Sequence, residues 1–158
     1  MAEGLHLPGL VDHHCHGILT GDLDRRLFEG LMNEAPGPSL LGTTVFDSML
    51  GLAVRRHCAP LLDLEPLVPA EAYLARRAEL GGAEVSARLM AATGIEVLLV
   101  DTGIGPAELT APDALAALCG GTAHEIVRLE RVAEEVLATG TDDVAGAVVE
   151  RLETACAA

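Results

Sequence analysis

Residues 95–101 read IEVLLVD, and this stretch indicates the fold class. It is short and almost wholly apolar, as is typical of a strand buried on both faces of a parallel sheet. Further strands are expected over residues 7–15 and 124–132, and helices over residues 112–118, 132–138 and 142–157. This alternation of strands and helices favours the α/β class, with parallel strands joined by right-handed crossovers.

A long helical insertion separates the first two expected strands, over about residues 21–94. Apolar spacing, together with proline and glycine punctuation, predicts helices over residues 22–34, 46–62, 69–80 and 83–93, with a loop over residues 35–39. Asp22 or Asp24 is expected to cap the first of these helices. We expect the insertion to cover one end of the sheet within a single domain that spans residues 1–158.

The chain has 158 residues, a formal net charge of −14 and no lysine, because all ten basic residues are arginine. A field of this sign repels phosphate backbones and anionic lipid surfaces, so neither nucleic acid nor a membrane is expected as a partner. The four cysteines are widely spaced, which favours reduced thiols in a cytoplasmic protein. The N-terminal stretch lacks the basic and apolar regions of a signal peptide.

The main functional signal is the sequence VDHHCHG at residues 11–17. Side chains two apart on a strand point to the same side, so Asp12, His14 and His16 are expected on one face. Cys15 is expected on the other face, as a packing residue. Two imidazoles about 6–7 Å apart along a strand can both reach one divalent metal. The alternative is a histidine-rich strand end whose hydrogen bonds are satisfied without a metal.

The stretch LVDHHCHG at residues 10–17 resembles the first-strand D-x-H-x-H motif of the amidohydrolase superfamily. His14 and His16 match the two metal-ligand positions of that motif, and Asp12 matches the acid before them. Residues 46–64 and 95–103 also resemble metal-dependent hydrolases of the amidohydrolase-2 type.

This resemblance implies the N-terminal portion of a TIM-type (β/α) barrel, an incomplete barrel with about three parallel strands. It also implies a small-molecule substrate and hydrolysis of a C–N or ester bond by metal-activated water, although some relatives decarboxylate instead. Zinc is the first expectation for the metal, and manganese, iron or nickel also suit imidazole ligands. Because a pair of histidines lacks the three protein ligands typical of catalytic zinc, this chain alone is expected to bind the metal weakly at most, or not to retain it.

The resemblance covers only the N-terminal part of the family's fold. A full barrel of this kind takes ~250 residues. Family members take further metal ligands from later strands, whereas this chain has only His57 and His124 after His16. We therefore expect a truncated chain that is inactive alone. The alternatives are a non-catalytic remnant, or half of a split barrel whose open sheet edges favour self-association or a partner that supplies the missing strands.

Three further residues are candidates for a substrate or metal site. Asp101 ends the strand at residues 95–101, where a parallel barrel places functional carboxylates, and its alternative role is that of a cap or turn residue. Arg128 and Glu130 are expected on one face of the third strand. There they would bind a polar substrate near the barrel mouth or pair with each other.

Overall fold

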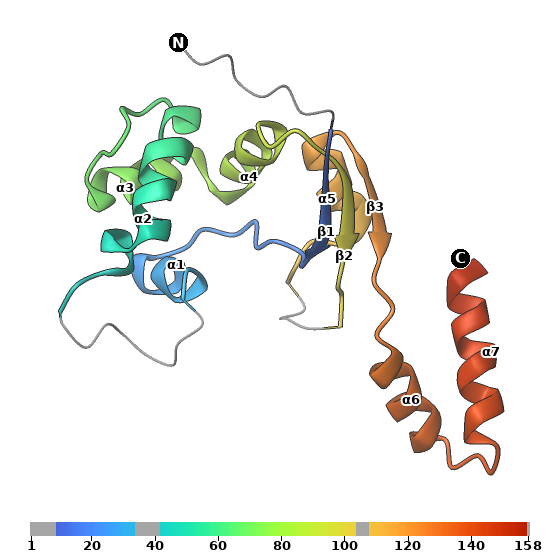
Figure 1. Cartoon of the computed structure of the whole chain (residues 1–158). Coiled ribbons are helices and arrows are strands. Elements are labelled where there is room, and N and C mark those ends of the chain that lie inside the picture. The colour runs from blue at the N-terminus through green and yellow to red at the C-terminus, as the bar shows by residue number, and fades with distance from the viewer. Residues whose placement is uncertain (1–8, 34–41, 104–107, 158) are drawn as a thin grey trace. The chain divides into compact units, whose positions relative to one another are not determined.

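The computed structural model describes residues 9–33, 42–103 and 108–157, and the chain divides into two compact units (Figure 1). We call residues 1–18 and 95–158 the sheet unit, and residues 19–94 the helical unit. The helical unit coincides with the expected insertion. The loop expected over residues 35–39, and the first two residues of the strand expected over 7–15, lie outside the described residues.

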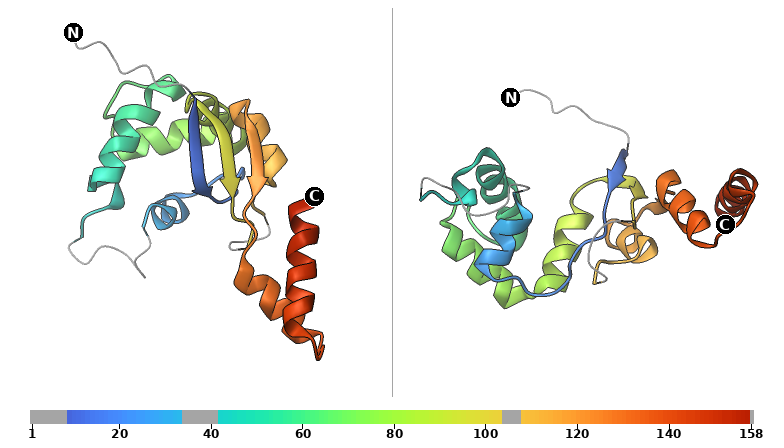
Figure 2. Two further views of the ribbon diagram at one scale, coloured as in Figure 1. Left: turned by 45° about the vertical axis from the view of Figure 1, so that its right-hand side comes forward. Right: turned by 90° about the horizontal axis from the view of Figure 1, so that it is seen from below.

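The sheet unit contains three parallel strands in the order β1 (Leu10–Cys15), β2 (Ile95–Val100) and β3 (Thr122–Glu125). The strands lie side by side and run in the same direction (Figure 2). The predicted α/β class with a parallel sheet is therefore confirmed. Parallel pairing brings the carboxyl ends of all three strands to one edge, which is where ligands bind in open α/β sheets.

Three helices complete the described part of the sheet unit: α5 (Pro112–Cys119), α6 (Leu129–Ala138) and α7 (Val144–Ala157). Helix α5 packs against β2 and β3, and its Leu115 is buried, as are Leu98 and Val100 of β2. It has a proline in its first turn and ends at Gly120, whose φ of 74° favours glycine. In the part of the chain that the structure describes, no helix is both long and apolar enough to cross a bilayer.

The strand predicted over residues 124–132 was wrong in its second half. Strand β3 ends at Glu125 and helix α6 begins at Leu129. From Leu129 onward, apolar residues recur three and seven positions later, at Val132 and Val136, which is helical spacing. Val136 is buried. Over the short window of residues 126–132, apolar residues at 126 and 132 also fit a two-residue period, so periodicity alone did not separate the two patterns.

The helical unit is built from α1 (Arg25–Leu31), α2 (Met49–Ala53), α3 (Ala70–Leu80) and α4 (Gly82–Ala91), with 3₁₀ turns at Val45–Asp47 and Pro60–Leu62 and a π turn at Val54–Cys58. Its core contains Phe28, Phe46 and Tyr73, whose ring centroids lie 5.4 to 6.3 Å apart. Leu62 and Val85 are fully buried in the same core.

The single helix expected over residues 46–62 is broken into short turns. The Ser48 hydroxyl accepts a hydrogen bond from the backbone N–H of Gly51 at 3.1 Å, so a new helix begins there. A side chain on Gly51 would come within 2.4 Å of the Phe46 backbone, so these two turns pack too closely for any residue but glycine. Helix α1 begins as predicted, because the Asp24 carboxylate accepts from the backbone N–H of Leu27 at 2.8 Å.

The neighbours Leu61 and Leu62 allow a matched test of the helical unit's core. Leu62 has none of its side chain exposed, whereas Leu61 is 39% exposed. We expect Leu62→Ala to lower the free energy of unfolding by about 2–5 kcal/mol, because it removes a buried side chain and leaves a cavity. Leu61→Ala should cost less than about 1 kcal/mol. Urea denaturation of both variants checks this, and equal losses would show that the core is packed differently.

Candidate metal centre

The three residues of the candidate site meet at the carboxyl edge of the sheet. His14 lies near the end of β1, His16 directly after it, and Asp101 directly after β2. The backbone N–H of Asp101 donates to the carbonyl of Cys15 at 2.8 Å, which continues the pairing of the two strands into the site. The parallel ladder therefore brings together residues that are far apart along the chain.

The two histidines lie on the same side of β1, as the two-residue period predicts. Their ring centroids are 5.4 Å apart, with an angle of 81° between the ring planes. Asp12 lies close by, since its carboxylate accepts from the backbone N–H of His14 at 3.2 Å. Cys15 directs its thiol to the carbonyl of Leu99, 3.6 Å away. Burial raises the pKa of that thiol, which fits its expected role in packing.

Hydrogen bonding fixes the orientation of the His16 ring. The ring Nδ1 lies 2.9 Å from the backbone carbonyl oxygen of Asp101. A carbonyl can only accept, so Nδ1 carries the hydrogen, and in the neutral ring the lone pair is then on Nε2. A hydrogen bond from one ring nitrogen to a backbone carbonyl is the usual support of a metal-binding histidine.

Glycine at position 17 lets the chain after His16 pass close to Thr110. A side chain there would come within 2.4 Å of the backbone carbonyl oxygen of Thr110. Two hydrogen bonds link Ile18 to Thr110, one from each backbone N–H and each 3.0 Å long. This contact anchors the segment that follows the two histidines.

Asp101 is a buried, ionised carboxylate, with 1% of its side chain exposed. It accepts from Nε of Arg128 at 2.9 Å, from Nη2 of Arg128 at 2.6 Å, and from the backbone N–H of Gly103 at 2.9 Å. These hydrogen bonds, led by those of Arg128, lower the pKa of Asp101 from its ordinary 3.8 to about 2. The carboxylate therefore keeps its charge although it is buried.

Each of His14, His16 and Asp101 offers one ligand atom, and these three atoms all lie within 4.8 Å of one another. In this group, Nε2 of His14 is 3.7 Å from Oδ2 of Asp101. The sequence pattern predicted the pair of histidines and marked Asp101 as a separate candidate, but it did not place the three together. The signal that could have joined them is the parallel pairing itself, which puts the first residue after β2 beside the end of β1.

Arg128 and Glu130 do not lie on a strand, so the prediction that they share a strand face was wrong. Arg128 is the N-cap residue of α6 and Glu130 belongs to its first turn, because β3 has already ended at Glu125. The two side chains do pair, with Nη1 of Arg128 3.3 Å from a carboxylate oxygen of Glu130. Glu130 is 68% exposed and contributes no atom to the group formed by the histidines and Asp101.

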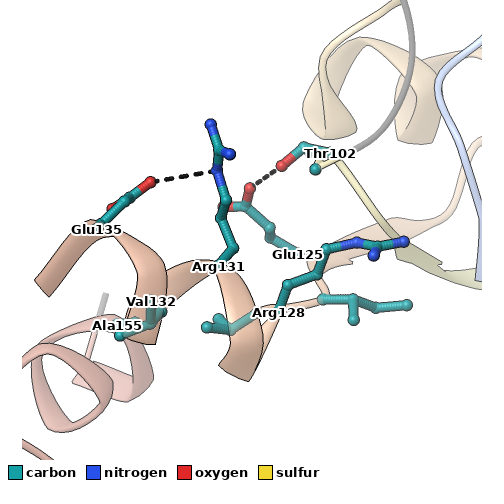
Figure 3. A pocket seen from close by; sticks show the side chains of 10 residues that line it. Thr102, Glu125, Arg128, Arg131, Val132, Glu135 and Ala155 are labelled. Carbon is teal, nitrogen blue, oxygen red and sulfur yellow. Dashed lines mark hydrogen bonds and ion pairs between the residues drawn. The ribbon is translucent and has the colours of Figure 1, made fainter. Parts of the chain in front are cut away.

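A pocket of about 400 Å³ lies beside this centre, at the start of α6 (Figure 3). Arg128 belongs to both, because it lines the pocket and also binds Asp101. In Figure 3 the Arg128 and Arg131 side chains extend from α6 in different directions. The hydroxyl of Thr102 donates to the carboxylate of Glu125 at the pocket wall. The volume is within the range of small-molecule sites.

The lowered pKa of Asp101 predicts how acid acts on the folded chain. A carboxyl whose pKa in the folded chain is about 2, below the ordinary 3.8, stabilises the fold above pH 3.8, and this contribution is lost as the pH falls through about 2. We expect Arg128→Gln to be less stable than the wild type at pH 5–7, and most of the difference to disappear between pH 4 and pH 2. Urea unfolding across this range measures it, and a difference independent of pH would contradict the ion pair.

Comparison of the chain with models of protein families, with curated proteins and with solved structures found no match.

Proposed function

We propose that this chain belongs to a metal-dependent hydrolase of the amidohydrolase type, and that His14, His16 and Asp101 hold its divalent metal. The observation that supports this most is the convergence of three ligand atoms within 4.8 Å at the carboxyl edge of a parallel sheet. That edge is where (β/α) barrels place their chemistry. The proposal includes a TIM-type arrangement of the sheet unit.

The residues fit a divalent metal in three respects. In the neutral ring of His16, Nε2 holds the lone pair, because Nδ1 is engaged by the Asp101 carbonyl. Asp101 is ionised, and its Oδ2 lies 3.7 Å from Nε2 of His14, while Arg128 and Gly103 donate to its two oxygens. Two imidazoles and one carboxylate are a ligand set of catalytic zinc, and manganese, iron and nickel accept the same donors.

The residues of this chain would hold the metal beside a pocket for the substrate, but they would not supply every group that the reaction needs. A bound metal would lower the pKa of a water molecule and polarise a substrate carbonyl. His14, His16 and Asp101 would hold the ion at the edge of the sheet, beside the 400 Å³ pocket that could receive a small substrate. In the family that the sequence resembles, a later strand supplies the carboxylate that activates the water. General-base assistance is worth roughly 10²–10⁴-fold in rate.

The direct test is a zinc titration of the chain by calorimetry. We expect one zinc per chain, with affinity reduced more than ~100-fold in the His14→Ala/His16→Ala variant, because both imidazoles are lost. Asp101→Asn should also weaken binding. His13→Ala is the matched control, since this exposed histidine neighbours the pair but is not part of the group. We expect no turnover of amides or esters at a family-like rate. An absence of zinc binding, or equal binding by the double variant, would refute the metal centre.

A second candidate function is that of half of a split barrel, and the exposure of β1 favours it. Among the described residues β1 pairs only with β2. Its apolar side chains Leu10 and Val11 are 41% and 59% exposed, although strands of parallel sheets are normally covered on both faces. An unpaired, apolar edge strand favours association with another chain or with a second copy of this chain.

Sedimentation velocity tests this candidate on the chain alone. We expect a concentration-dependent increase in sedimentation coefficient that Val11→Lys abolishes, because a charge on an edge strand opposes strand addition. Val149→Lys is the control, since Val149 is 55% exposed but lies on α7. A chain that stays monomeric at all concentrations would refute self-association through β1. Only a different partner chain could then pair with this edge. Equal effects of both lysines would point to a general effect of charge instead.

A further inference from the structure

Arg128 makes the most extensive side-chain contact of the candidate centre. Its Nε lies 2.9 Å from both carboxylate oxygens of Asp101, and its Nη2 lies 2.6 Å from Oδ2. Only 27% of the Arg128 side chain is exposed, and Asp101 is buried. A guanidinium that meets a carboxylate through two adjacent N–H groups fixes the plane of that carboxylate as well as its charge.

The remaining contacts of Asp101 show how its two oxygens are held. Oδ1 accepts from the backbone N–H of Gly103 and from Nε of Arg128, and Oδ2 accepts from Nε and Nη2 of Arg128. Arg128 therefore contacts both oxygens of the carboxylate. Oδ2 is also the oxygen that lies 3.7 Å from Nε2 of His14.

The fold holds Arg128 in this place through contacts on both sides. The backbone N–H of Ile126 donates to the carbonyl of Val100 at 2.8 Å, which anchors the segment before Arg128 to the end of β2. A side chain on Gly103 would come within 2.6 Å of Cδ of Arg128, so glycine leaves the room in which the arginine lies. The Arg128 side chain is therefore packed against the same turn that presents Asp101.

We propose that Arg128 is a positioning residue of the metal centre, which turns Asp101 so that Oδ2 faces His14 and His16. This inference rests on the proposed metal-binding function and adds a residue that binds no metal itself. The alternative is an ion pair that only joins the end of β2 to the start of α6. Lysine could preserve the charge of such a pair, but it lacks the planar fork that fixes the carboxylate.

The test is a cobalt(II) titration of the full chain, followed by calorimetry and by the visible absorption of the bound ion. We expect Arg128→Gln to lose roughly 10–100-fold in cobalt affinity, the size typical of residues that orient a metal ligand. Arg128→Lys should recover only part of this loss, and both variants should alter the absorption bands. Arg131→Gln is the matched control, because Arg131 lies one turn further along α6, is 65% exposed and approaches its acidic neighbours no closer than 3.6 Å.

Gly103→Ala gives a second route to the same result if Arg128→Gln fails to fold. The new methyl group displaces the arginine without removing its charge, so cobalt affinity should fall in the same direction. In metal-free protein, the NMR signal of the Gly103 amide should shift in Arg128→Gln but not in Arg131→Gln, because this amide donates to Asp101.

The outcomes separate the two proposals. A wild-type chain that binds no cobalt refutes the metal centre itself, and the Gly103 signal then still decides whether Arg128 orients Asp101. A wild-type chain that binds cobalt, with Arg128→Gln binding it equally or more tightly, overturns only the positioning role. Full recovery by Arg128→Lys would also overturn it, since charge alone would then suffice.

Discussion

The candidate centre depends on the parallel pairing of β1 with β2. The N–H of Asp101 bonds to the carbonyl of Cys15 at 2.8 Å, and this places the carbonyl of Asp101 2.9 Å from Nδ1 of His16, 85 positions away in the sequence. A shift of the pairing by one residue would turn both imidazoles to the opposite face of the sheet. The pairing is irregular between Asp12 and Cys15, the segment that contains His14, because three steps along β1 there match two steps along β2.

Charge compensation is the second constraint, because the chain carries 24 acidic residues and only ten arginines. Arg25, Arg76 and Arg88 each bridge two carboxylates at the surface of the helical unit. Exposed pairs of this kind contribute about 0–1 kcal/mol each. Asp101 differs because it is almost wholly buried, and a buried carboxylate without a cationic partner would take up a proton instead. Arg128 therefore keeps available the negative charge that a metal would need.

Local patterns predicted most elements of the sheet unit, because their causes are local. The apolar run at residues 95–101 gave β2 and the position of Asp101 at its end, and the two-residue period put both histidines on one side. The strand predicted over residues 124–132 was wrong in its second half, because a window this short fits the spacing of both a strand and a helix, and the structure has a helix from Leu129 onward. The pair of Arg128 with Asp101 was missed for the same reason, since it depends on where β3 ends. The break near Gly51 in the helix expected over residues 46–62 was not predicted. It depends on the close approach of two turns, which helix propensity does not reveal.

The contacts of the centre show how small a piece of an α/β sheet can assemble it. One histidine lies on β1 and the other directly after it, the carboxylate follows β2, and the arginine that pairs with the carboxylate follows β3. None of the described residues that make these contacts belongs to the helical unit. Two strands bring the three candidate ligand residues together, and among the described residues the segment after the third strand supplies the cation that pairs with the buried carboxylate. The three parallel strands therefore carry both the candidate ligands and the charge that balances Asp101.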